Sequence, residues 1–141
     1  MHPIVYASLF VALGGALGAL ARFALNLSLN VNTEFPWGTL AANFLGCMIM
    51  GVLAQCIVNA HWFHQSGIFP EQYRLLFVVG FCGSFTTLSA LVFEVSAMLQ
   101  RDEILASFSY LMVTIVGGFV CFYIGVVATR GLLSLLFQGS T

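Results

Sequence analysis

The sequence predicts an all-α integral membrane protein, with four transmembrane helices in a single domain over residues 1–141. Of its residues, 60% are hydrophobic and only 6% are charged, whereas a soluble domain carries about 25% charged residues. The apolar residues form four segments, roughly 4–27, 38–60, 75–99 and 105–136. About 20 apolar residues suffice to cross a bilayer, so we expect a multi-pass membrane protein.

The first segment begins close to the N-terminus, and we interpret it as a membrane helix. It lacks the basic region of a signal peptide, and its apolar stretch is too long for one. Gly14, Gly18 and Arg22 are spaced by four residues and share one helix face. The two glycines permit close contact with another helix. Arg22 either reaches the membrane interface or lines an aqueous vestibule and attracts anions, and the sequence leaves both interpretations open.

The second and fourth segments carry polar side chains at helical spacing. Thr39 and Asn43 share a face of the second helix. A buried Asn amide needs partners for its donors and its acceptor, which favours an interhelical hydrogen bond. In the fourth segment, Tyr110, Thr114 and Gly118 repeat every four residues. Their hydroxyls either face a polar path or, in the case of Thr114, bond back to the helix backbone.

The third segment has a polar centre, "GFCGSFTTLS" at residues 80–89. Each glycine weakens a helix interior by about 1 kcal/mol relative to alanine. A break near Gly83 would free backbone carbonyls that bind cations and a helix N-terminus that favours anions. The stretch therefore predicts either an ion site at mid-membrane or a packing seam of small residues. Glu94 follows as a proton carrier, an ion-pair partner or a vestibule group, and its spacing does not decide between these roles.

The positive charges are balanced across the predicted membrane. An even number of helices places both termini on one side, together with Arg74 and Arg130. Arg22 and Arg101 fall on the other side, and the chain contains no lysine. An excess of Lys and Arg in cytoplasmic loops normally sets orientation. The balance predicts insertion in both orientations and an antiparallel homodimer, unless a partner or a weak local signal sets the orientation. The net charge of −1 offers no basic surface for nucleic acid.

Three segments together resemble the Fluc (CrcB) fluoride channels: "GGALGALARF" at 14–23, "PWGTLAANFLG" at 36–46 and "GFCGSFTTLSALVFE" at 80–94. Their order and spacing and the four-helix length also match that family. The resemblance implies a fluoride-selective channel of the inner (plasma) membrane, not an enzyme, that gives passive fluoride efflux and fluoride resistance. It further implies a dual-topology, antiparallel homodimer whose third helices are broken and which holds two pores and a central sodium ion.

The resemblance also implies roles for individual residues. The sodium ion is expected on the backbone carbonyls of Gly83 and Thr86 from both subunits. Fluoride is strongly hydrated, and hydrogen-bond donors must replace its water. We expect these donors, and positive potential at the pore mouth from an arginine, along a pathway that contains Asn43, Ser89, Tyr110, Thr114 and Arg22.

The chain departs from the family pattern at the pore. The family motif T-T-F-S-T-F is here T-T-L-S-A-L, so that Leu88 and Leu91 replace two phenylalanines that line the pathway. Aromatic ring edges carry partial positive charge, and leucine has no such edge. An altered or non-conducting subunit of such a channel is therefore an alternative. A small proton-coupled multidrug exporter is a second alternative, although the first segment lacks the central carboxylate that this mechanism needs.

Overall fold

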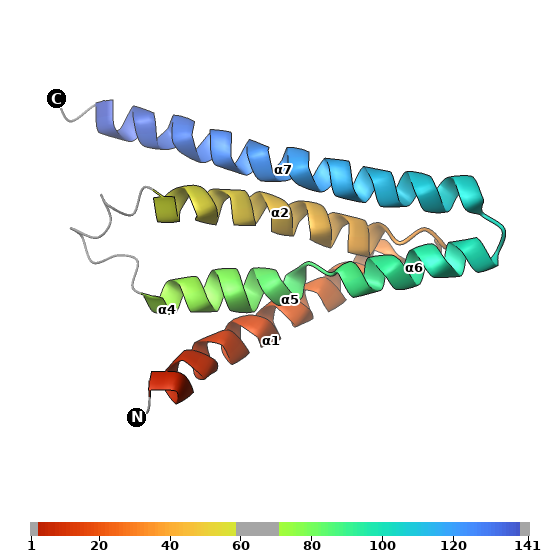
Figure 1. Ribbon diagram of the computed structural model, residues 1–141, viewed down its shortest axis with the longest axis horizontal. Helices are drawn as coiled ribbons and strands as arrows, with labels where there is room; N and C mark the ends of the chain where they lie inside the picture. Colours follow the sequence, from red (N-terminus) through yellow and green to blue (C-terminus); the bar gives the residue numbers. More distant parts are fainter. Residues whose placement is uncertain (1–2, 59–70, 139–141) are drawn as a thin grey trace.

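The computed structural model describes residues 3–58 and 71–138, and no strand occurs within these ranges. The first helix is α1 (Pro3–Leu29) and the second is α2 (Trp37–Val58). The third membrane helix is divided into α4 (Glu71–Tyr73), η1 (Arg74–Cys82), α5 (Gly83–Phe85) and α6 (Leu88–Gln100). The fourth is α7 (Ile104–Gln138). Figure 1 shows that the start of α1 and the end of α7 lie at the same end of the bundle.

Four helical stretches are long and apolar enough to cross a membrane: Ile4–Leu29, Trp37–Val58, Glu71–Gln100 and Ile104–Leu135. They confirm the predicted all-α fold with four spans. The third begins four residues before its predicted start at 75, because the helix continues through the polar residues Glu71 to Arg74. Residues 59 and 60, the predicted end of the second span, lie outside the described residues.

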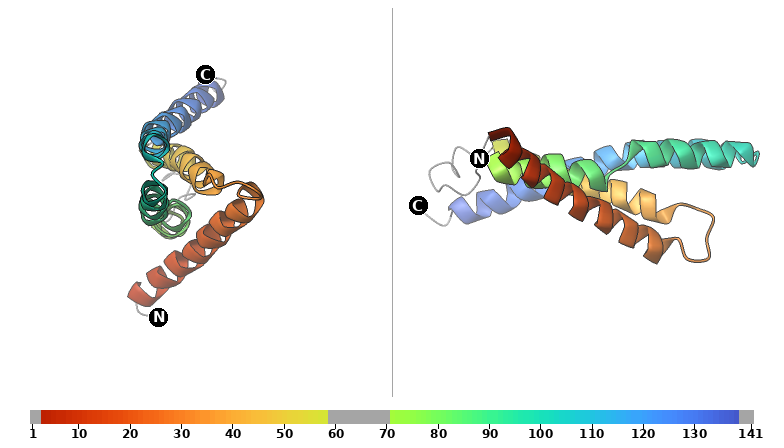
Figure 2. Two further views of the ribbon diagram at one scale, coloured as in Figure 1. Left: turned by 90° about the vertical axis from the view of Figure 1, so that its right-hand side faces the viewer. Right: turned by 90° about the horizontal axis from the view of Figure 1, so that it is seen from below.

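The helices associate in pairs that are not neighbours in sequence. The most extensive contacts are between α2 and α7 and between α1 and η1, and α6 packs on α7. Within each of the two main pairs the helices run in the same direction (Figure 1). Figure 2 shows α1 crossing below α2 at an angle, with only its upper part close to α2. In the sequence, each helix is therefore separated from its main partner by a helix that runs back along the bundle in the opposite direction.

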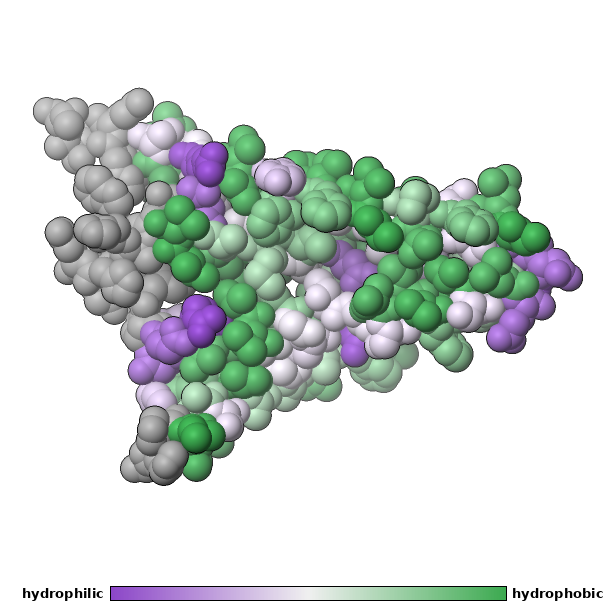
Figure 3. All heavy atoms as spheres, viewed as in Figure 1, coloured by the Kyte–Doolittle hydropathy of each residue, from purple (hydrophilic) through white to green (hydrophobic). Residues whose placement is uncertain are grey.

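Most of the apolar surface is outside rather than inside. The buried apolar cluster consists of Leu40, Leu91, Met98 and Tyr110. Figure 3 shows hydrophobic side chains along the length of the helices, with hydrophilic ones mainly towards the two ends. In a bilayer this distribution places apolar side chains against lipid tails. Association between the helices then depends on close packing and on polar contacts.

Glycines set the distance between α1 and η1. A Cβ atom added to Gly14 would overlap the backbone carbonyl of Leu76, and one added to Gly18 would overlap that of Phe81. The two helices therefore meet backbone to backbone. The Ser84 hydroxyl lies at this contact, 2.8 Å from the Gly15 carbonyl oxygen, to which it donates. The predicted role of the glycines in close packing is confirmed.

Two residues of extended backbone separate α5 from α6 (Figure 1). Thr86 has φ −83° and ψ 149°, and Thr87 has φ −149° and ψ 119°. Gly83 keeps helical angles, φ −61° and ψ −29°, although the sequence suggested an interruption close to it. The helix ends at the threonines instead, because their backbone and side chains find other partners there, as described below.

We expect Gly14→Ala to lower the free energy of unfolding by about 1–3 kcal/mol, the usual cost of overpacking. Its new methyl group would meet the rigid backbone of η1 rather than a flexible side chain. Thermal unfolding in detergent micelles, followed by size-exclusion chromatography, measures the change.

Gly15→Ala is the matched control, since a Cβ there has no atom within 4 Å. Its midpoint should equal that of the unsubstituted protein or exceed it slightly, because alanine favours the helix. Equal stability of the two variants would contradict the backbone contact at Gly14.

Candidate functional site

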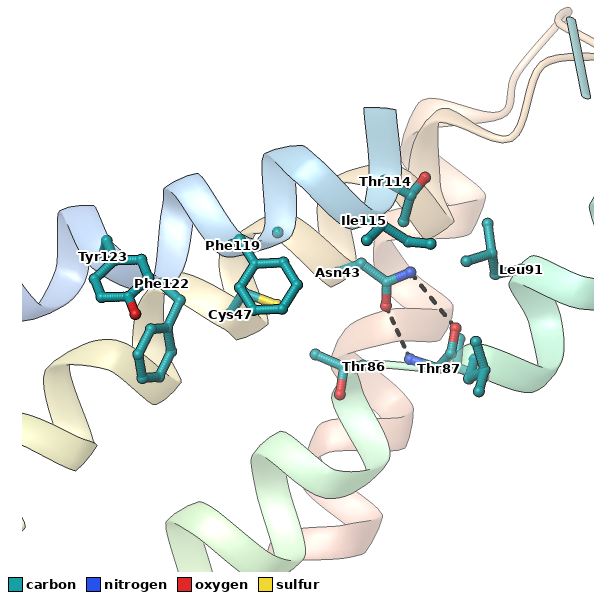
Figure 4. Close-up of a pocket in the computed structure, with 12 residues that line it drawn as sticks. Asn43, Cys47, Thr86, Thr87, Leu91, Thr114, Ile115, Phe119, Phe122 and Tyr123 are labelled. Atoms are coloured by element: carbon teal, nitrogen blue, oxygen red, sulfur yellow. Dashed lines mark hydrogen bonds between the residues drawn. The ribbon is translucent and has the colours of Figure 1, made fainter. Parts of the chain in front are cut away.

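The side chain of Asn43 forms hydrogen bonds with the backbone N–H and the backbone carbonyl of Thr87. Its Oδ1 accepts the Thr87 N–H at 2.9 Å, and its Nδ2 donates to the Thr87 carbonyl over a longer 3.5 Å (Figure 4). Asn43 is buried, and a buried peptide group without a partner costs about 1–3 kcal/mol. The interhelical hydrogen bond expected for Asn43 is confirmed, and it joins α2 to the interruption in the third helix.

The same contacts redirect the amides that normally bond to two backbone carbonyls. In an uninterrupted α-helix, the Thr87 N–H would donate to the carbonyl of Gly83, and the Ala90 N–H to that of Thr86. Here the Thr87 N–H donates to Asn43 and the Ala90 N–H donates to the Thr87 hydroxyl at 3.2 Å. The carbonyls of Gly83 and Thr86 therefore lack their regular helical donors.

The hydroxyl groups beside the interruption bond to nearby groups of their own helix. The Thr86 hydroxyl donates to the Cys82 carbonyl at 2.9 Å. The hydroxyls of Thr87 and Ser89 lie 3.1 Å apart, and either one can donate. Thr87 is thus the N-cap of α6, and the threonines complete the two helix ends that the interruption creates.

A second polar cluster joins α2, α6 and α7 around Glu94. One carboxylate oxygen accepts a hydrogen bond from the Thr39 hydroxyl at 2.6 Å, and the other accepts one from the Tyr110 hydroxyl at 2.7 Å. Thr39 and Tyr110 are each 1% exposed. The Thr114 hydroxyl donates to the Tyr110 carbonyl at 2.7 Å, which is the local bond that the sequence left open. Glu94 is therefore held within the bundle by two hydroxyl donors.

A cavity of about 420 Å³ lies beside the interruption, between α2, the third helix and α7 (Figure 4). Asn43 and Thr87 lie on its wall, together with Leu88, Leu91 and Thr114. The remaining lining residues are mostly apolar: Cys47, Thr86, Ile115, Gly118, Phe119, Phe122 and Tyr123. This cavity is an open groove, in which Leu88 is 71% exposed, and it brings several predicted pathway residues to one place about midway along the bundle.

Comparison with known proteins decides the family. The model of the CrcB family, described as CrcB-like protein, Camphor Resistance (CrcB), matches residues 9–126. The chain belongs to the CrcB family.

Several relatives carry the name "Fluoride-specific ion channel FluC". The one from Chlorobium phaeobacteroides (strain BS1) is 42% identical over 125 residues, which cover 87% of this chain and 93% of the relative. The one from Chlorobium luteolum is 39% identical, with 92% and 95% covered. The one from Francisella philomiragia is 33% identical, with 83% and 89% covered. With its four apolar helices, this CrcB protein is a multi-pass protein of the plasma membrane and not an enzyme.

The predicted pathway residues of this CrcB protein occupy four separate places. Asn43, Leu88, Leu91 and Thr114 line the cavity. Tyr110 belongs to the Glu94 cluster, and Ser89 bonds to Thr87 at the start of α6. Arg22 lies on α1, and its buried Nε has no hydrogen-bond partner among the residues that the structure describes.

The Glu94 cluster was missed by the sequence analysis, which treated Thr39, Glu94 and Tyr110 separately. A usable signal existed: a carboxylate inside an apolar helix requires hydrogen-bond donors from other helices. Thr39 and Tyr110 carry hydroxyls within the neighbouring apolar segments. The sequence alone did not say which of the hydroxyl groups in the bundle would lie beside the carboxylate.

We expect Asn43→Leu to lower the free energy of unfolding by about 1–3 kcal/mol, because it leaves the Thr87 amide and carbonyl without partners. Thermal unfolding in detergent micelles measures this loss.

Ser96→Ala serves as its control. The Ser96 hydroxyl is exposed and donates to the carbonyl of Val92 in the same helix, so its removal should change stability by no more than about 0.5 kcal/mol. If Asn43→Leu were as stable as Ser96→Ala, the bond between Asn43 and Thr87 would contribute nothing to the fold.

Proposed function

We propose that this CrcB protein is a fluoride-selective ion channel that lets fluoride leave the cell passively and so gives fluoride resistance. The observation that carries this proposal is its similarity, over 87% of the chain, to a relative named fluoride-specific ion channel FluC. The cavity beside Asn43 is consistent with such a role, because it lies between membrane helices and contains an amide side chain. The pathway would include Asn43, Ser89, Tyr110, Thr114 and Arg22.

The polar groups of the proposed pathway already have partners within the protein. Asn43 bonds to Thr87, and the Tyr110 hydroxyl bonds to Glu94. When fluoride accepts a hydrogen bond from one of these groups, the group exchanges its acceptor in the protein for the ion. The ion is therefore held firmly enough to lose water but weakly enough to move on, as conduction requires. The first turn of α6 adds partial positive charge near Thr87.

The two leucines support a second candidate, an altered or non-conducting subunit of such a channel. Leu88 and Leu91 both line the cavity, and neither can donate a hydrogen bond to an anion. The proton-coupled exporter is not favoured. Its mechanism needs a carboxylate in the first helix, and Pro3–Leu29 contains neither Asp nor Glu.

We further propose that two copies associate in opposite orientations around a sodium ion. The balance of two arginines on each side supports dual orientation. The carbonyls of Gly83 and Thr86 fit a sodium ion, because they are hard oxygen ligands whose usual amide donors are engaged elsewhere. Such an ion would supply fixed positive charge near the pathway.

Purified protein alone in liposomes should release fluoride when a potassium gradient and valinomycin balance the charge, while chloride stays inside. A fluoride electrode and a chloride electrode measure the two effluxes. Protein-free liposomes are the control. Fluoride retention by verified, folded protein would favour the non-conducting subunit, and release of both anions would remove the proposed selectivity.

If the protein inserts in both orientations, a tag at the C-terminus should be found on both sides of the membrane. Labelling of cells with a membrane-impermeant reagent, before and after permeabilisation, measures the two populations. Labelling on one side only would exclude dual orientation.

The purified dimer should bind sodium in preference to potassium. Titration of sodium into dimer prepared in N-methylglucamine buffer measures this binding, with potassium as the comparison ion. Equal responses to both cations would exclude a sodium site.

A further inference from the structure

One wall of the central cavity is formed by aromatic side chains of α7. Phe119, Phe122 and Tyr123 line it together with Ile115, because residues spaced by three, four and seven share a helix face. Figure 4 shows these rings along α7, with Cys47 of α2 beside Phe119. They extend the cavity from Asn43 towards the C-terminal half of α7.

Phe119 is the ring of this wall that lies nearest in sequence to the polar part of the cavity. It follows Thr114 and Ile115 by about one turn of α7. The rings of Phe122 and Tyr123 pack edge to face against each other, with centroids 5.6 Å apart and an interplanar angle of 88°. Phe119 lines the cavity and is 66% exposed, so its ring is not packed away in the protein interior.

The chemistry of the other apolar lining residues explains why this ring matters. Leu88 and Leu91 face the same cavity, and their aliphatic C–H groups carry little positive charge. The edge of a phenyl ring carries the positive part of its quadrupole. A partly dehydrated anion beside Asn43 therefore has a favourable electrostatic contact with a ring edge and none of that kind with the leucines.

We propose that Phe119 lines the fluoride pathway and stabilises the ion through its ring edge, as a specificity-determining residue. This inference rests on the proposed channel function. It assigns to α7 the aromatic contact that Leu88 and Leu91 do not supply from α6. The pathway then passes between the amide of Asn43 and the ring of Phe119.

Fluoride efflux from liposomes containing Phe119→Leu tests the proposal. We expect this variant to release fluoride about fivefold to tenfold more slowly than the unsubstituted channel, which is the scale of an aromatic edge contact. Phe119→Tyr keeps the ring edge and should conduct like the unsubstituted protein. Phe108→Leu is the matched control, since Phe108 is also an exposed ring of α7, 60% exposed, and lies outside the cavity lining.

A compensating variant separates the ring edge from simple packing. Leu88 is 71% exposed, so Leu88→Phe adds a ring to the cavity without overfilling the core. In the Phe119→Leu background it should restore most of the lost fluoride efflux. Unchanged efflux in Phe119→Leu would overturn the proposal, and so would an equal loss in Phe119→Leu and Phe119→Tyr without rescue by Leu88→Phe. These results leave the channel function in place, whereas a silent unsubstituted protein overturns both.

Discussion

The fold around the site depends on one pair of hydrogen bonds, between the side-chain amide of Asn43 and the peptide group of Thr87. Extended backbone inside a membrane protein exposes polar groups that lipid cannot satisfy. The side-chain amide of Asn43 presents its carbonyl oxygen and one of its N–H groups on the same side, so it satisfies both the N–H and the carbonyl of Thr87 from a neighbouring helix. This allows the third helix to stop at Thr86 and to start again at Leu88 at the centre of the bundle.

Other features of the site follow from this contact. While the Thr87 N–H donates to Asn43, the Thr87 hydroxyl caps α6 by accepting the Ala90 N–H. Two carbonyls are left without their regular donors, and the redirected third helix leaves a cavity against α7. Near the middle of α6, the carboxylate of Glu94 joins this helix to α2 and α7. Thus polar contacts with other helices hold α6 at its start, through Thr87, and near its middle, through Glu94.

The sequence was sufficient to predict the number of spans and the close packing at Gly14, since both depend on local composition. It also identified the polar stretch that contains the interruption. It did not place the interruption, because glycine at position 83 is compatible with helix and only the partner on α2 decides where the helix ends. The Glu94 cluster and the aromatic wall at Phe119 depend on which helix faces meet, and helical spacing within one segment does not contain that information.

The pairing of α1 with η1 and of α2 with α7 also constrains how the chain is assembled during synthesis. When α1 enters the membrane, the surface that its glycines contact has not yet been made. The same holds for α2 until α7, the last helix, has been translated. Neither main pair can therefore close behind the ribosome one helix at a time. The first two helices must remain in the bilayer or beside the insertion machinery with Asn43 unsatisfied, so that the polar amide that later supports the interruption is a cost during biogenesis.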